Sequence, residues 1–445
     1  MYYAIAFEER NKPTATLCNQ GFINDARSAA SSKGVPGIRV VSETVPPGCT
    51  VVEDVEAGVA AAMDNIVATL TRPLTAEERS PRPRDSEKFT RIIFKGNLQE
   101  VNRFFYRRGW TDGLPVIPPT EEAVAEMLTG TDLPPDYLIG KMLPRLGKAT
   151  VEKVAINAVM AGALPTYMPL LIAGVQALLD PITDAHGWAV SVGSWAPFWI
   201  INGPIRHDLH VNSGVGALSP GDIANAAIGR AMGLITKNMR GTRKGIEDMG
   251  TLGNPMKYAM VAAENEEESP WEPLHVEQGF NKADSTVSLF FPNSFIHGGR
   301  FPNVIYHIPP VPGVTCLMVT PQHAKDLARD GWTKKDIKSY IYEYARIPFY
   351  QHSSYPDGSP VIESMEKKSL PANPQDYVRL IPNPEALWLF IAGGPGGGLG
   401  VMKGSPRMKA GEKRVNLVTK KITLPANWDK LVAKYSDIVP KYGMY

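Results

Sequence analysis

The sequence predicts an α/β or α+β protein in which a small N-terminal α/β unit precedes a larger mixed α/β domain. Segments of strand character alternate with segments of helical periodicity, and no internal repeat is visible in the sequence. The chain has 445 residues, which is enough for two or three domains. Its hydrophobic content of 43% and charged content of 21% are typical of a protein that buries a core.

The small unit is predicted over residues 1–75. KPTATLC and PGIRVVSETV read as strands, and FINDARSAASSKG between them reads as a helix that ends at a glycine. EDVEAGVAAAMDNIVATL then predicts a helix with one apolar face, made of Val55, Val59, Met63, Ile66 and Leu70. The charged, proline-bearing stretch that follows indicates a linker, which we place at residues 76–94.

The larger domain is predicted over residues 95–425, with residues 426–445 as a C-terminal tail. Between Lys153 and Asp180 the chain carries no charge, and this run is long enough to cross a bilayer. The sequence Leu-Pro-Thr-Tyr-Met-Pro interrupts it, however, so we predict two buried helices joined by a turn rather than a membrane span.

Further strands and helices are expected in the rest of this domain. WAPFWIINGP, MKYAMVAAEN, GVTCLMVT and ALWLFIAGG read as strands. SPGDIANAAIGRAMGLI predicts a helix capped by Ser219, and TPQHAKDLARDG predicts one capped by Thr320 with Pro321 in its first position.

Composition excludes several classes of function. A net charge of +2 and the absence of a basic stripe argue against nucleic acid as a partner. Cys18, Cys49 and Cys316 are too few and too scattered for a disulfide framework or a cysteine zinc site. The N-terminus lacks the pattern of a signal peptide, so we expect a cytoplasmic protein.

The stretch VAAENEEESPWEPLHVEQGF raises the question of chemistry. Its glutamates follow a predicted strand, at the end where open α/β sheets bind ligands, and two prolines stiffen the loop. Crowded carboxylates shift one another's pKa, so Glu264, Glu267 and His275 are the predicted acid–base residues. The alternative is an exposed acidic loop with no chemical role.

Other residues are predicted to bind the substrate. Asn202 and Asn212 offer amide groups, Arg230 falls on an apolar helix stripe where it needs an anionic partner, and His323 lies in a helix's first turn. The Arg230 partner could equally be a structural glutamate, and His323 could be a packed surface residue. The full predicted set is Asn202, Asn212, Arg230, Asn265, His323, Gly394, Gly396 and Gly397.

No metal or other cofactor is predicted. His207 and His210, with Asp208, form only a weak alternative metal site because no third ligand is evident at a suitable spacing. The glycine run GGPGGG at 393–398 is not followed by Lys-Ser/Thr and does not fit GxGxxG, which disfavours nucleotide binding. No GxSxG, HExxH or EF-hand signature is present.

A family resemblance adds to this interpretation. The N-terminal unit resembles the C-terminal half of the UGSC family of (seleno)proteins, which is similar to the C-terminal part of selenoprotein B of glycine reductase. The residues that carry the resemblance are Pro13, Thr14, Cys18, Phe22, Ala26, Gly34, Val35 and Pro36. In that family a Sec/Cys-Gly-Ser-Cys motif lies upstream of this segment, and here the chain begins just after the expected position. The resemblance therefore implies either a thiol supplied by a separate chain or the absence of redox function.

The remaining body looks like the large domain that accompanies UGSC-type units. Motifs such as RGWTDGLPVIPPTEE, INGPI and FIAGGPGGG carry this second resemblance. Cys18 alone is read as a small buried hydrophobe and not as the missing nucleophile.

Three functions stay open at this point. The first is an oligomeric enzyme subunit, reductase- or lyase-like, acting on a small carboxylate-bearing molecule, with thiol- or selenol-assisted cleavage of a carbon–heteroatom bond implied by the resemblance. The second is a thiol-independent lyase, hydratase or hydrolase that uses Glu and His. The third is a non-catalytic partner of a redox subunit.

Overall fold

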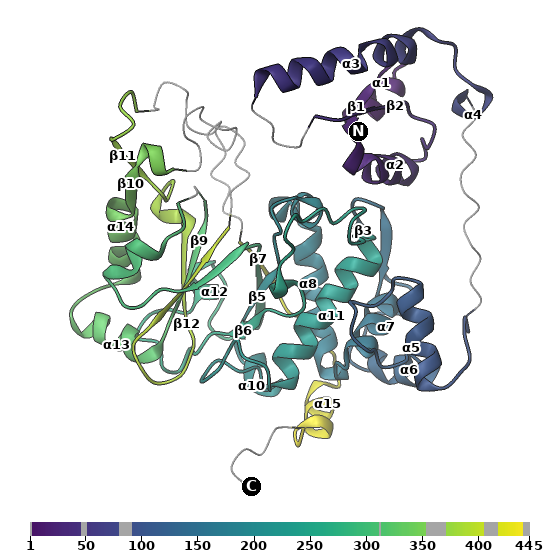
Figure 1. Cartoon of the computed structure of the whole chain (residues 1–445). Coiled ribbons are helices and arrows are strands. Elements are labelled where there is room, and N and C mark those ends of the chain that lie inside the picture. The colour runs from purple at the N-terminus through teal and green to yellow at the C-terminus, as the bar shows by residue number, and fades with distance from the viewer. Residues whose placement is uncertain are drawn as a thin grey trace. The chain divides into compact units, whose positions relative to one another are not determined.

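The computed structural model describes residues 2–45, 51–79, 91–310, 313–352, 371–404 and 417–438. Helices and strands alternate along them, which confirms the α/β or α+β prediction (Figure 1). The chain forms two compact units. One comprises residues 1–110, 141–148 and 236–249, and the other comprises residues 111–140, 149–235 and 250–445. The division predicted at residues 75 and 95 stays a prediction.

After a first helix at Tyr2–Glu8, which was not predicted, the first unit has the predicted strand–helix–strand–helix order. Strands β1 (Thr16–Asn19) and β2 (Val40–Glu43) pair in parallel, and helix α2 (Ile23–Ser32) connects them. Helix α3 (Val52–Thr71) follows, and it buries only Ala62 among its described side chains. Val55, Val59, Met63 and Leu70 are exposed, because α3 approaches β2 through small residues such as Gly58, next to Val45. The shorter helices of this unit are α1 (Tyr2–Glu8), α4 (Ala76–Arg79) and α5 (Leu98–Arg107).

The second unit contains the predicted uncharged helix pair. Helices α7 (Val151–Ala161) and α8 (Met168–Leu179) are separated by a short 3-10 turn at Pro165–Tyr167, so proline breaks the run as expected. Among the described residues, no helix has both the length and the apolar character that crossing a membrane requires. Helices α6 (Glu121–Leu128) and α9 (Ala185–Val190) also belong to this unit. Strands β3 (Leu138–Met142) and β4 (Gly147–Thr150) have residues in both units.

Two four-stranded sheets form the centre of this unit. The first has the order β14-β7-β5-β6 and the second has the order β12-β9-β13-β8. The strands of the first sheet are β5 (Phe198–Asn202), β6 (Val261–Ala263), β7 (Thr286–Phe290) and β14 (Val418–Lys421). Those of the second are β8 (Ser294–His297), β9 (Thr315–Val319), β12 (Leu387–Ile391) and β13 (Leu399–Lys403).

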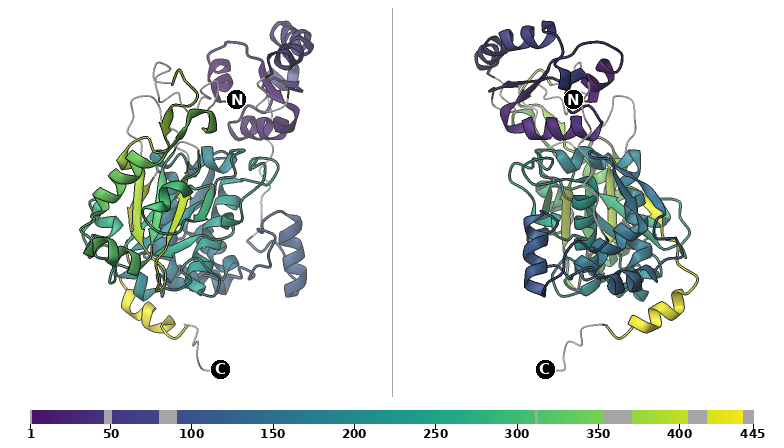
Figure 2. Two further views of the ribbon diagram at one scale, coloured as in Figure 1. Left: turned by 60° about the vertical axis from the view of Figure 1, so that its left-hand side comes forward. Right: turned by 90° about the vertical axis from the view of Figure 1, so that its right-hand side faces the viewer.

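The core lies between the sheets. Phe198 of β5 and Phe390 of β12 have ring centroids 5.9 Å apart, and one buried cluster includes apolar side chains from both sheets. Helices α8 and α11 (Ile223–Arg240) lie beside the first sheet, whereas α13 (Pro321–Arg329) and α14 (Lys334–Tyr344) lie beside the second (Figures 1 and 2). Burial of this much apolar surface is the main stabilising term for the unit.

The two sheets repeat one topology. In each, a parallel pair joined by helices (β5 with β6, β9 with β12) continues into an antiparallel strand (β7 or β13). The fourth strand of each sheet follows the last strand of the other sheet in the sequence. Strand β8 follows β7 but pairs with β13, and β14 follows β13 but pairs with β7. The structure therefore contains a repeat that the sequence does not reveal.

Two element boundaries differ from the prediction. Helix α11 begins at Ile223 and not at Ser219, because residues 217–222 form turns in which Asp222 accepts a hydrogen bond from the side chain of Asn212. Only three residues of MKYAMVAA form strand β6, since Pro255–Lys257 make a 3-10 turn. The remaining elements are α10 (Ile205–Asp208), α12 (Leu274–Glu277), β10 (Arg346–Pro348), β11 (Tyr377–Arg379) and α15 (Trp428–Tyr435).

Candidate functional site

Three strand ends meet beside the acidic segment. Strands β5 and β6 run in parallel, so Asn202 and Glu264 emerge at the same edge, and the Glu264 amide donates to the carbonyl of Ile201 at 3.0 Å. The Asn265 amide donates to the carbonyl of Ile391, at the end of β12, at 2.7 Å. This edge is therefore where the two sheets are joined, and it is the edge at which open α/β sheets bind ligands.

Glu264 is buried at the centre of this junction, with 0% of its surface exposed. Its Oε2 accepts hydrogen bonds from Asn202 Nδ2 at 2.6 Å and from the Leu274 amide at 2.7 Å. Its Oε1 accepts from the Ile391 amide at 3.3 Å. Burial raises the pKa of this carboxyl, against the opposing effects of Lys334 and of the hydrogen bonds. Glu264 thus ties three strands and helix α12 together.

Arg206, on helix α10, organises the next two glutamates. Only 4% of it is exposed, and its guanidinium donates to the carbonyl oxygens of Gly203 at 2.9 Å and Glu264 at 2.7 Å. It also makes a two-point contact with Glu267, at 2.9 and 3.2 Å, and lies 3.1 Å from Glu266 Oε1. A buried arginine held in this way fixes both carboxylates in position.

Glu266 faces inward beside Asn202. Its Oε1 accepts from Asn202 Nδ2 at 3.0 Å and from the Gly203 amide at 2.7 Å. Asn202 Oδ1 and the hydroxyl of Thr286, its cross-strand neighbour, are buried without a hydrogen-bond partner among the described residues. The inner side of the site is therefore polar and incompletely paired.

Glu267 pairs with His207 at the solvent side. The Glu267 carboxylate lies 2.9 Å from His207 Nε2, and 66% of the His207 side chain is exposed. Hydrogen bonds from Arg206 outweigh partial burial and, with the bond to His207, lower the pKa of Glu267 to about 2. A carboxylate that stays ionised can hold an imidazole in a fixed orientation, as a general acid–base group requires.

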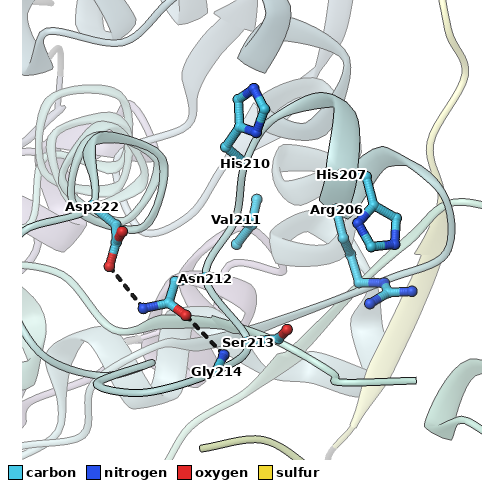
Figure 3. Close-up of a pocket in the computed structure, with 8 residues that line it drawn as sticks. All are labelled: Arg206, His207, His210, Val211, Asn212, Ser213, Gly214 and Asp222. Atoms are coloured by element: carbon cyan, nitrogen blue, oxygen red, sulfur yellow. Dashed lines mark hydrogen bonds between the residues drawn. The ribbon is translucent and has the colours of Figure 1, made fainter. Parts of the chain in front are cut away.

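His207 of this pair lines a pocket of about 490 Å³, together with Arg206. Figure 3 shows Arg206 and His207 on one side of it, His210 on another, and Asn212 hydrogen bonded to Asp222 and Gly214. The Asn212 amide group also donates to the carbonyl of Val215 at 2.9 Å, so this side chain shapes the loop at residues 212–216. Asn225, which is buried on α11, supports the loop because its Oδ1 accepts a hydrogen bond from the backbone amide of Asn212 at 2.8 Å.

The glycine run after β12 lies beside this loop. The Gly393 amide donates to the carbonyl of Ser213 at 2.9 Å, and a Cβ at Gly394 would lie 2.5 Å from Val215. Gly396 has a φ of +118°, which favours glycine, and its carbonyl accepts from the Thr320 hydroxyl at 2.6 Å. Thr320 precedes α13 as predicted but bonds to the glycine run instead of capping the helix, and a Cβ at Gly397 would meet Arg300.

Two predicted substrate-binding residues are engaged elsewhere. The Arg230 guanidinium donates to both carboxylate oxygens of Asp112, at 2.8 and 3.0 Å, and to the carbonyl of Pro115. His323 is buried in the first turn of α13, and its Nε2 accepts from the Phe301 amide at 3.0 Å. Burial and the charge of Arg300 lower its pKa, which favours a neutral imidazole. Neither residue lines the pocket beside Glu267.

His275 and Asn265 have internal positions. His275 is fully buried, with Nδ1 3.9 Å from Glu266 Oε1 and no hydrogen-bond partner for that nitrogen among the described residues. Asn265 Oδ1 accepts from the Glu268 amide at 3.3 Å. No three His, Cys, Asp or Glu side chains in the described part of the chain are grouped so as to hold a metal ion. His207 and His210 both line the pocket, but they have no such third ligand.

Sequence reasoning missed Arg206 and Glu266. Arg206 lies four residues after Asn202, in INGPIRHD, and Glu266 lies two residues after Glu264, in AENEEE. Asn202 was predicted because it follows an apolar strand. The same criterion, applied to the helical turn that comes next, would have included Arg206.

The comparisons with known proteins bear on the first unit. Residues 1–72 match the UGSC family. These residues contain the β1–α2–β2–α3 arrangement described above, so the N-terminal unit is of the UGSC type. Comparison with curated proteins gives no match, and comparison with solved structures gives none either.

Cys18, in the UGSC-type unit, lacks the lowered pKa of an activated thiol. Partial burial and the carboxylates of Asp25 and Glu43 raise the pKa of Cys18, and its Sγ donates to the carbonyl of Asn19 at 3.5 Å. Cys316, in strand β9 of the second unit, is fully buried, and burial raises its pKa well above the ordinary value. Reactive cysteines need a depressed pKa and access; the pKa of both is raised, and Cys316 also lacks access. Cys49 lies outside the described residues.

Proposed function

We propose that the second unit is an enzymatic unit that performs acid–base chemistry on a small polar molecule, with His207 as the proton-transferring group. The observation that carries the proposal is that His207 lines the pocket and pairs with Glu267, which Arg206 holds in place. Glu267 would orient the imidazole through Nε2, which leaves Nδ1 for a substrate proton. Glu264 and Asn202 would position these groups without touching the substrate, since both are fully buried.

The reaction class favoured by this arrangement is addition, elimination or hydrolysis that needs one proton carrier. The carboxylate-bearing substrate predicted from Arg230 stays a prediction. Arg230 itself is engaged by Asp112, whereas His210 lines the pocket and is placed to meet an anionic group. Residues 211–214 would form the wall against which the substrate lies.

The test is turnover of a panel of small hydroxy, amino and unsaturated acids by the full chain, without thiol and followed by NMR. His207→Gln should lower kcat by about 100-fold or more, the typical contribution of general acid–base catalysis. His186→Gln is the matched control, because it removes a histidine that lies 3.1 Å from a carboxylate outside this pocket. Equal turnover by the His207→Gln variant and the wild type would refute the proposal.

A second candidate function follows from the UGSC match. In it, the same pocket acts with a thiol or selenol from a partner chain, and a carbon–heteroatom bond is cleaved. The raised pKa values of Cys18 and Cys316 favour an external thiol over either of these two. Turnover that appears only after addition of a Cys-Gly-Ser-Cys peptide would support it. Should such a complex be equally active with His207→Gln and Glu267→Gln, the chain would instead be a non-catalytic partner.

A further inference from the structure

A second pocket is built from the later part of the acidic segment. It has a volume of about 560 Å³, and its walls include Trp271, Glu272, Glu277, Lys334, Lys338 and Pro384. The two lysines come from helix α14, one turn apart, so their ammonium groups lie on the same face. The acid–base chemistry proposed above uses none of these residues.

Two ammonium groups in this pocket share one carboxylate. Lys334 Nζ lies 2.9 Å from Glu277 Oε1, and Lys338 Nζ lies 3.1 Å from Glu277 Oε2. Lys334 is only 6% exposed and also donates to the carbonyl of Glu272 at 2.6 Å. Glu264 lies 4.0 Å away, and its oxygens already accept from backbone amides and from Asn202. Two ammonium groups, those of Lys334 and Lys338, thus face the single carboxylate of Glu277 in the inner part of the pocket.

Hydrogen-bond donors remain available there. An ammonium group has three N–H donors. The contacts given above use two donors of Lys334 and one of Lys338, so up to three remain for a ligand. Ser339 adds a hydroxyl on the same wall. These donors suit an anionic group of the size of a carboxylate.

The outer part of the pocket restricts which anion fits. Trp271 and Pro384 give an apolar surface, and the Trp271 indole is held by a hydrogen bond to the carbonyl of Trp332 at 3.1 Å. Glu272 and Glu385 place two carboxylates near the mouth, with only Lys335 to balance them. Negative charge at the mouth disfavours a dianion more than a monoanion.

We propose that this pocket binds a small monocarboxylic acid with an apolar body, its carboxylate on Lys338 and Lys334 and its body against Trp271 and Pro384. The site is separate from the pocket at His207, because the two share no lining residue. It adds a ligand class that the proposed acid–base function does not require, so an experiment can refute either proposal without refuting the other.

The experiment titrates the full chain with benzoate, phenyl phosphate and benzyl alcohol, using calorimetry and the indole N–H signals in NMR. Benzoate should bind and shift one tryptophan indole signal, phenyl phosphate should bind more weakly, and benzyl alcohol should not bind. Lys338→Gln should weaken benzoate by about tenfold, the value of one charge-assisted hydrogen bond. The matched control is Lys325→Gln, whose ammonium pairs with Glu268 on the surface at 2.8 Å and should leave affinity unchanged.

Three outcomes would overturn the proposal. One is no binding of benzoate at millimolar concentration, and another is equal affinity in Lys338→Gln and the wild type. The third is affinity lost in His207→Gln but kept in Lys338→Gln, which would put benzoate in the first pocket. Thermal unfolding of each variant checks the fold. If Lys338→Gln unfolds, Ser339→Leu, which narrows the pocket from an exposed helix position, gives the same test.

Discussion

The two β-sheet halves of the second unit share a backbone arrangement and differ in the residues at their strand ends. The Glu264 amide bonds to Ile201 at 3.0 Å in the first half, and the Ala392 amide bonds to Val319 at 3.0 Å in the second. Strand β5 pairs with β6 and β7 in the same way as β9 pairs with β12 and β13. Asn202 therefore occupies the position in the first half that Thr320 occupies in the second, and Glu264 the position of Ala392. One half therefore presents carboxylates at this edge, and the other presents a hydroxyl and glycines.

This difference shows that one topology can carry different side chains at its strand ends, and that the first residues after the strands decide the polarity of each edge. Asn202 reaches across to Glu264 and Glu266, whereas Thr320 bonds only to the glycine run. Buried charge is also treated differently. Arg206 in the first half is neutralised by glutamates, while Lys403 in the second half is fully buried against neutral oxygens.

Replacing Glu264 should break the comparison most strongly. Glu264→Ala gives the first half the residue of the second and leaves the amides of Leu274, Ile391 and Asn202 without their acceptor. We expect the free energy of unfolding to fall by about 3–5 kcal/mol, because buried donors lose their partners. Urea denaturation measures this loss. Glu268→Ala, in the same segment but exposed, should leave the free energy of unfolding almost unchanged, and equal losses in both variants would show that Glu264 does not join the sheets.

Lys403 offers a pH test of the second half. Burial lowers its pKa to about 7, and its ammonium donates to the carbonyls of Gly313 and Leu380 and to the Thr315 hydroxyl. The unfolded chain binds this proton up to the ordinary lysine pKa near 10.5, so it holds more protons than the folded chain between about pH 7 and 10.5. The stability contributed by this group is therefore lowest below pH 7 and rises towards pH 10.5.

Lys403→Met should remove that rise, which amounts to several kcal/mol at about 1.4 kcal/mol per pKa unit. Unfolding free energies at pH 7, 8 and 9 measure the slope. Lys420→Met, on β14 and paired with Asp180 at 2.6 Å, should keep the wild-type slope. A slope that stays the same after Lys403→Met would mean that Lys403 is not buried in the folded protein.

Replacing Thr320 should give the smallest loss of stability. Thr320→Val keeps the shape but removes the donor to the Gly396 carbonyl and the acceptor for the Gly398 amide, which lies 3.1 Å from the hydroxyl. We expect a loss of about 1 kcal/mol, the usual value of a partly exposed hydrogen bond. Amide hydrogen exchange at Gly398 should quicken, while exchange at Leu274 in the other half should not. Quickening at both sites would indicate that the halves do not open separately.

Local sequence signals predicted most of the elements. The helix pair at residues 151–179 was predicted because proline marks its break, and β5 and β12 because they are apolar runs bounded by turn residues. The repeat was not predictable, because hydrogen-bond register depends on backbone pairing and the paired residues, such as Glu264 and Ala392, have no side-chain similarity.

The sequence by itself determined that acidic and amide side chains follow buried strands, and that the N-terminal residues form a UGSC-type unit. Only the tertiary structure decided which of them act together. Arg206 and Glu267 are 61 residues apart and meet because a parallel crossover returns the chain to the same sheet edge. Arg230 meets Asp112 across 118 residues, and this pairing satisfies the charge that its own helix leaves unmatched. Such partners are decided by proximity in the folded chain, and local patterns of polarity in the sequence do not reveal it.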